Sequence, residues 1–247
     1  QDGVAFIARS AARQRAEAKP PGAVVIHPVA MRYTFNGDVE KSLAPVLDKI
    51  ESRLSWQPQR GEPLHPRIVK LGHALLALKE LEYFGAAQTG TVNERLSRLL
   101  GQVLDPLEME WLKRRSDDTV VQRVKALRKA ILPGLIDGEV TEADRVRRWK
   151  QLYDLEIAQQ IYHFPPDYLG TNPTPMRLIE TVQRYEEALG NPNPAVHRPI
   201  QLRCEIGDAI EVSPVRDRRA PSDPVMDQLR SSLVNMLGIA DPLHGPS

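Results

Sequence analysis

Two kinds of hydrophobic spacing divide this chain into three parts. Residues 23–35 contain a continuous apolar run followed by alternation, which predicts a strand covered on both faces. Pro28 lacks a backbone donor, so we expect the pairing to be interrupted there. Residues 200–206 also alternate, with Cys204 among the apolar positions, and predict a half-buried strand. Between the two strands, apolar residues recur every three or four positions, as they do in amphipathic helices.

About six helices are expected between residues 38 and 190. Thr91 with Glu94 is a capping-box signature for the start of one helix, and Pro133-Gly134 is expected to end the next. After a possible cap at Thr141, a further helix has an apolar stripe formed by Val146, Trp149 and Tyr153. Two more helices flank the strands, one before residue 20 and one opened by Pro224. We expect no internal repeat of fixed period.

The order of these elements predicts an α/β protein that is predominantly helical. Residues 1–36 and 196–240 each combine a strand with a helix, and are expected to form one α/β domain. Residues 37–195 are expected to form an inserted helical domain, and residues 241–247 a disordered tail. Because two strands alone are not stable, they either pair with each other on a packed support or belong to a larger sheet.

Composition excludes several classes of function. The net charge of +1 gives no basic field for non-specific nucleic-acid binding, and no apolar run is long enough to span a membrane. The single cysteine excludes an internal disulfide and fits a reducing, cytoplasmic compartment. Short basic clusters at 113–115 and 216–219 are interpreted as solvated termini, with an anionic membrane surface or phosphate as the alternative.

No complete catalytic constellation is present in the sequence. None of the six histidines has ligands at metal-binding spacing, and there is no nucleophile elbow or glycine-rich phosphate loop. His27 is interpreted as a hydrogen-bonded structural residue and Cys204 as a core residue. We therefore assign no catalytic residue, no metal and no cofactor to this chain.

Both ends of the chain nevertheless resemble the C-terminal portion of the glycerophospholipid acyltransferase family. The block from Val24 to Arg32 is similar to the family's fourth motif, and the helix from Gly3 to Glu17 is similar to the helix that precedes this motif. His27 departs from the usual aliphatic residue, and Asp208-Ala209-Ile210 replaces the commoner Glu-Pro-Ile. The chain looks like planctomycete-type members with a large helical insertion. The other similar segments are Leu54–Arg60, Leu202–Ile210 and Val225–Leu237.

The resemblance implies transfer of a fatty acyl group from acyl-CoA or acyl carrier protein to a glycerol phosphate-type acceptor, in phospholipid synthesis. It implies substrate-binding roles for Ile26, Pro28, Val29 and Arg32. The family's His-x-x-x-x-Asp dyad and Glu-Gly-Thr-Arg motif do not occur in this sequence. We therefore expect them upstream of Gln1, in a longer parent protein, and expect this part alone to be inactive.

Two further expectations follow from the resemblance. The partners of the parent protein would be the acyl donor and a glycerophospholipid precursor, with no nucleic acid, and it would be cytoplasmic with a peripheral contact at the inner membrane face. The alternative is a non-catalytic helical scaffold or protein-interaction module that shares only the flanking strands.

Overall fold

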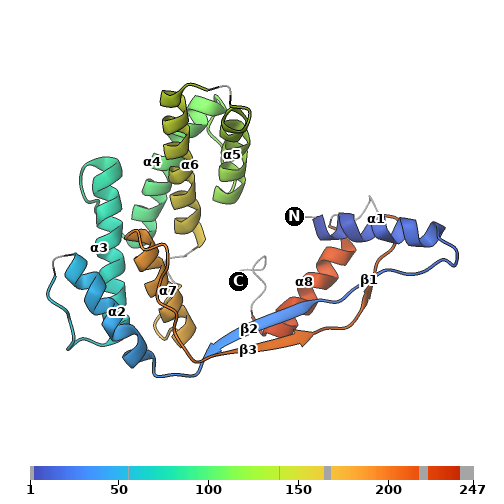
Figure 1. Cartoon of the computed structure of the whole chain (residues 1–247), viewed down its shortest axis with the longest axis horizontal. Helices are drawn as coiled ribbons and strands as arrows, with labels where there is room; N and C mark the ends of the chain where they lie inside the picture. Colours follow the sequence, from blue (N-terminus) through green and yellow to red (C-terminus); the bar gives the residue numbers. More distant parts are fainter. Residues whose placement is uncertain (1–2, 55, 139, 164–167, 217–221, 240–247) are drawn as a thin grey trace. The chain divides into compact units, whose positions relative to one another are not determined.

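A computed structural model describes residues 3–54, 56–138, 140–163, 168–216 and 222–239 (Figure 1). The chain divides into two compact units, one formed by residues 1–37 and 198–247 and the other by residues 38–197. The sequence analysis placed the inserted helical domain at residues 37–195. The expected tail at 241–247 lies outside the described residues.

The first unit, here called the ribbon unit, contains the four strands. In chain order its elements are α1 (Gly3–Glu17), β1 (Val25–Ile26), β2 (Val29–Phe35), β3 (Ile200–Ile206), β4 (Ile210–Glu211) and α8 (Pro224–Leu237). β2 pairs antiparallel with β3 and β1 pairs antiparallel with β4, in two separate two-stranded sheets. The break between β1 and β2 falls at His27-Pro28, as the proline predicts.

Two expectations about these strands are wrong. Val25 in β1 is exposed, although a strand covered on both faces was expected, and every residue of β3, including Cys204, is exposed. The reason is that each sheet has only two strands, and no described element forms a second layer over the apolar side of β3. The core of the unit lies instead between α1, α8 and β4, where Ala8, Val212 and Leu229 are buried together.

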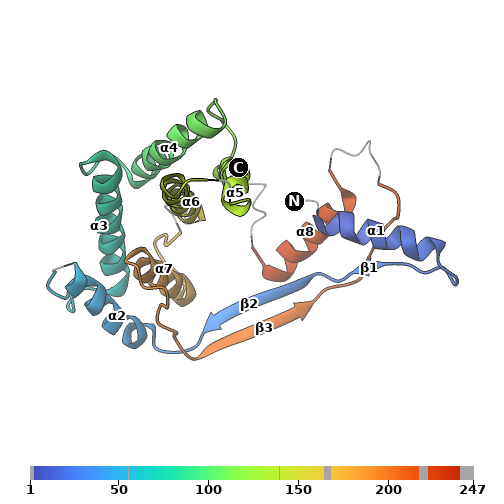
Figure 2. The same cartoon turned by 45° about the horizontal axis from the view of Figure 1, so that its top comes forward.

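The second unit, here called the helical unit, contains six helices among its described residues. They are α2 (Val39–Arg53), α3 (Leu64–Phe84), α4 (Val92–Trp111), α5 (Val120–Ile136), α6 (Glu142–His163) and α7 (Pro175–Ala188). Each of the helices α2 to α5 contacts the next one in the chain. α7 packs against α2 and α3, and α6 packs against α4 and α5 (Figure 2). Buried leucines on α4 and α5, with Leu155 of α6, form one apolar cluster of this unit.

The helix signals in the sequence were partly correct. The capping box of Thr91 and Glu94 is confirmed, and Thr174 and Gly238 cap α7 and α8. Pro133 lies inside α5 and does not end it, because proline removes only its own amide donor while its carbonyl still accepts from Asp137.

The stripe on α6 faces the opposite way from the one expected. Val146, Trp149 and Tyr153 are exposed, whereas Leu155 and Ala158 on the other side of the helix are fully buried. α6 has two apolar stripes, and its contacts with α4 and α5 cover only one of them. No helix in the described part of the chain is long and apolar enough to cross a membrane.

Candidate functional site

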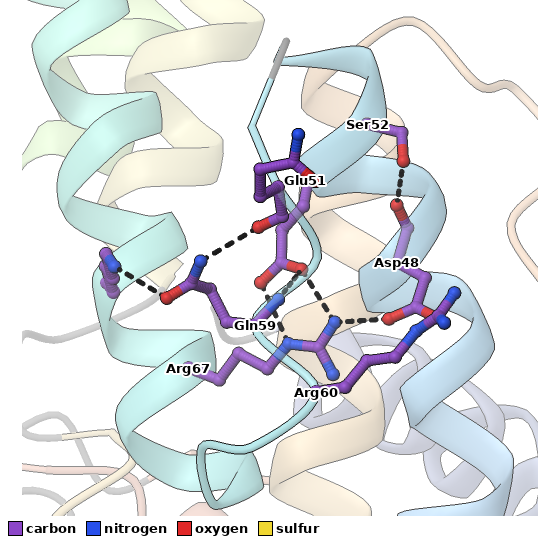
Figure 3. A network of polar contacts seen from close by, with 8 residues as sticks. Asp48, Glu51, Ser52, Gln59, Arg60 and Arg67 are labelled. Atoms are coloured by element: carbon purple, nitrogen blue, oxygen red, sulfur yellow. Dashed lines mark hydrogen bonds and ion pairs between the residues drawn. The ribbon is translucent and has the colours of Figure 1, made fainter.

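Buried carboxylates are the first candidates for chemistry, and Glu51 at the end of α2 is one of them. Its side chain is 1% exposed, and Arg67 donates to both carboxylate oxygens, at 2.8 and 2.6 Å (Figure 3). The backbone N–H of Gln59, in the loop between α2 and α3, donates to the same carboxylate at 2.9 Å. Asp48, one turn earlier, accepts a second bond from Arg67. One acid thus ties a helix end, the following loop and the next helix together.

The same arrangement occurs at the next two junctions. Each contains a fully buried glutamate, the amide of the residue eight positions later, and an arginine of the next helix that holds both carboxylate oxygens. We call each set a Glu–Arg junction. The three Glu–Arg junctions are Glu51–Gln59–Arg67, Glu80–Gln88–Arg95 and Glu108–Ser116–Arg123.

These junctions overturn the expectation that the chain has no internal repeat. Their arginines are spaced by 28 residues, at positions 67, 95 and 123. A sequence signal was present, because Thr91 and Thr119 each precede the arginine by four residues and each begins a capping box. The pattern escaped detection because the first copy has Pro63 in place of the threonine and the apolar positions drift between copies.

The electrostatics of the junctions fit a structural role. Hydrogen bonds from Arg95, together with the Gln88 amide, outweigh the effect of burial and lower the pKa of Glu80. Burial alone raises the pKa of Glu51, but the bonds from Arg67 and Gln59 reverse this and leave it below its usual value. Carboxylates held ionised by an arginine and a backbone amide are poor proton acceptors. We therefore assign these groups to the fold and not to catalysis.

The basic cluster at 113–115 also belongs to a junction. Lys113 has φ 58°, at the position where the preceding copy has Gly85 with φ 76°. Its ammonium donates to the carbonyl of Glu110 at 2.8 Å, and Arg115 lies 3.4 Å from Asp105. These contacts explain two of the three charges as helix-end interactions. In the second cluster, Arg218 and Arg219 lie outside the described residues.

A second candidate is the pair of strands β2 and β3, here called the ribbon. Residues directly opposite each other in an antiparallel pair lie on the same face, so the register of β2 and β3 defines the two faces. One face is entirely apolar, and all of its side chains except that of Phe35 are exposed, up to 70% for Ile206. Its cross-strand pairs are Val29 with Ile206, Met31 with Cys204, Tyr33 with Leu202, and Phe35 with Ile200.

The opposite face of the ribbon is polar, and α8 lies against β2 (Figure 1). Arg32 on this face donates to the main-chain carbonyls of Met236 and Leu237, at the end of α8. A guanidinium at a helix C-terminus satisfies carbonyls that have no partner inside the helix and interacts favourably with its dipole. Arg32 therefore fixes α8 to the ribbon.

The four residues assigned to substrate binding do not converge on one pocket. Ile26 packs beside the small core of the ribbon unit, and the carbonyl of Pro28 accepts a bond from Gly207 at 2.8 Å. Val29 lies on the exposed apolar face, whereas Arg32 lies on the opposite face. Of the four, only Val29 has a free side chain on an open surface.

The histidines that the structure describes are dispersed over both units. His27 contacts the carbonyl of Gly207 through Nδ1 at 3.0 Å, in line with the structural role expected for it. His197 is buried, and this burial lowers its pKa although Glu186 opposes the effect. In the described part of the chain, no group of three His, Cys, Asp or Glu residues could hold a metal ion.

Comparison with known proteins does not add an assignment. No family model, no curated protein and no solved structure matches this chain. The functional argument therefore rests on the exposed ribbon, on the Glu–Arg junctions, and on the sequence resemblance carried by the ribbon unit.

Proposed function

We propose that this chain is part of an acyltransferase that moves a fatty acyl group from acyl-CoA or acyl carrier protein to a glycerol phosphate-type acceptor. In this proposal the ribbon unit is the C-terminal part of the catalytic α/β domain, and the helical unit is an insertion in it. The catalytic histidine and aspartate, and the arginine that holds the acceptor phosphate, come from upstream of this sequence. The parent protein would act in the cytoplasm, with peripheral contact at the inner membrane face.

One observation carries the proposal. The two blocks that resemble the family are separated by the helical unit of residues 38–197, yet the strands that carry them, β2 and β3, pair with each other over all seven residues. If the helices between them are an insertion, the two blocks belong to one domain and are expected to pair with each other. The open apolar face also supports the proposal, since an exposed apolar surface of this kind is typical of a region that another protein segment covers.

Within the proposed enzyme, the four block residues take different roles. Val29 is the residue with a side chain available to a substrate, and Ile26 and Pro28 hold its strand in position. Arg32 acts as a positioning residue through its bonds to the end of α8. A Val29→Asp substitution is expected to raise the KM for the acyl substrate. Arg32→Gln is expected to act mainly by lowering the stability of the ribbon unit.

The decisive experiment uses the longer protein and this chain side by side. A long-chain acyl thioester and a glycerol phosphate acceptor are supplied to each, and acyl transfer is followed by thiol release. We expect turnover by the longer protein only. If the sequence before Gln1 contains neither a His-x-x-x-x-Asp dyad nor a Glu-Gly-Thr-Arg motif, the acyltransferase proposal fails.

A second candidate function is a protein-interaction module built on the helical unit. The exposed stripe of Val146, Trp149 and Tyr153 on α6 favours it, because aromatic residues on an open helix face are enriched at interfaces. Substitution of Trp149 and Tyr153 by serine would abolish binding of such a partner and leave acyl transfer by the longer protein unchanged. The reverse result would favour a role of the stripe in the enzyme.

A further inference from the structure

The outer edge of β3 has free backbone groups. Gly207 donates to Pro28 at one end of the ribbon and Asn36 donates to Pro199 at the other, which marks these as hydrogen-bonded pairs. Because such pairs alternate along an antiparallel ladder, residues 201, 203 and 205 also turn their backbone groups toward β2. The N–H and C=O groups of Ile200, Leu202, Cys204 and Ile206 therefore point away from β2, and no described strand pairs with them.

Neither a proline nor a bulge in β3 blocks this edge. The strand has seven residues without a proline or a bulge, and its alternate side chains are apolar. Natural proteins usually block such an edge with prolines, bulges or inward-pointing charges, because a free edge is a template for another strand. On β2, Arg32 and α8 lie over the polar face of the ribbon, where Arg32 donates to the carbonyl of Met236.

The charges on β3 are only loosely paired among the described residues. Arg203 lies directly opposite Arg32, a like-charged pair, and forms an ion pair with Glu205 of the same strand at 3.6 Å. The side chains of Arg203 and Glu205 are 74% and 45% exposed. Like charges opposite each other destabilise a strand pair, and an opposite charge in that position stabilises it.

We propose that two copies of this chain associate through the outer edges of β3, antiparallel across a two-fold axis at Cys204. The alternation of free backbone groups allows three registers with substantial overlap. A two-fold axis at Leu202 sets Arg203 opposite Gln201 of the second copy, and one at Arg203 sets two arginines opposite each other. The axis at Cys204 instead sets Arg203 opposite Glu205 of the second copy, twice in each dimer.

This dimer extends the ribbon to a four-stranded sheet. It also sets Leu202 opposite Ile206 of the second copy, so the apolar faces of the two ribbons become continuous. The pairing is isologous, as in most homodimers, because the same strand serves both copies. The inference does not depend on acyl transfer, and a failed enzyme assay leaves it unaffected.

Charge reversal tests the register. The association of the whole 247-residue chain is measured by sedimentation equilibrium over a range of concentrations. We expect a dimer for the native chain, a dissociation constant raised about tenfold or more for Arg203→Glu and for Glu205→Arg, and recovery in the double variant. Arg203→Glu also removes the clash with Arg32, so the monomer of this variant is expected to be at least as stable as the native monomer.

Cysteine cross-linking provides an independent measure. Opposed residues of a hydrogen-bonded pair have Cα atoms about 5.5 Å apart, within the range that a disulfide spans. Mild oxidation is therefore expected to give a covalent dimer through Cys204. The matched controls are Cys204→Ser with Leu202→Cys, which should not cross-link, and the same variant with Ile206→Cys added, which should.

Three results would overturn the proposal. The first is a native chain that stays monomeric at every concentration. The second is a dimer whose dissociation constant is unchanged by either charge reversal. The third is cross-linking through a cysteine at position 202 in the absence of one at position 206, which would place the axis at Leu202.

Discussion

The two units of this protein differ in how completely their polar groups are paired and their apolar surfaces are covered. The helical unit buries three glutamates completely, and each is held by an arginine and by a loop amide. The ribbon unit leaves a whole apolar strand face and a backbone edge exposed. Internal polar satisfaction is typical of a unit that is stable by itself, whereas an open face and edge are typical of a surface that another protein segment covers.

The largest expected effect comes from removing one acid of a Glu–Arg junction. Glu80→Ala leaves Arg95 and the Gln88 amide without their buried acceptor, and is expected to cost about 3–5 kcal/mol of stability. All three tryptophans lie in the helical unit, so their fluorescence during urea unfolding measures this loss.

The control for that prediction replaces both partners. Glu80→Met with Arg95→Met removes the charges together, and is expected to lose much less stability than the single substitution. A cost below about 1 kcal/mol for Glu80→Ala alone would contradict the structural importance of the junction.

A leucine-to-alanine substitution in each unit compares the stability that a buried and an exposed apolar side chain contribute. Leu104 on α4 is fully buried, so Leu104→Ala is expected to cost about 2–5 kcal/mol. Leu202 is 48% exposed on the ribbon, and Leu202→Ala is expected to cost within about 0.5 kcal/mol in the monomer. Thermal unfolding at a concentration below the dimer dissociation constant compares the two. A large loss for Leu202→Ala would mean that this face is covered.

The sequence predicted the local structure of both units better than it predicted which of their residues are buried. The cap at Thr91 depends on neighbouring residues and was correctly identified. The burial of Cys204 was predicted wrongly, because burial depends on which element packs on a face. Alternation shows which residues share a face but not whether that face is covered.

Acid should destabilise the helical unit selectively. The pKa values of Glu51 and Glu80 are lowered in the folded protein, so the unfolded state binds more protons in this range. Their contribution is fully present above the usual glutamate pKa of about 4.5 and is lost as the pH falls through the lower folded values. Unfolding curves between pH 3 and pH 6, followed by tryptophan fluorescence, are expected to fall more steeply for the native chain than for Glu80→Gln. Equal slopes would contradict this assignment.

The smallest expected effect concerns the helix ends of the repeated junctions. Gly85→Ala introduces a side chain at φ 76° and is expected to cost about 1 kcal/mol. Lys113→Gly relieves the equivalent conformation at φ 58°, and is expected to stabilise the helical unit by up to about 1 kcal/mol. Lys113→Ala loses the bond to the Glu110 carbonyl without relieving the conformation, so it should destabilise. Thermal unfolding of the three variants ranks them, and a stabilising Gly85→Ala would contradict the argument.

The sequence by itself determined the helices, their caps, the two strands and the interruption at Pro28, because these depend on backbone preferences and on periodicity over a few residues. It also contained the 28-residue spacing of the junction arginines, in a form that only the structure made readable. Tertiary structure alone decided that Arg32 holds α8, that Glu51, Glu80 and Glu108 are buried, and that the apolar face of the ribbon is open. Each of these depends on contacts between residues distant in the chain, which no local pattern encodes.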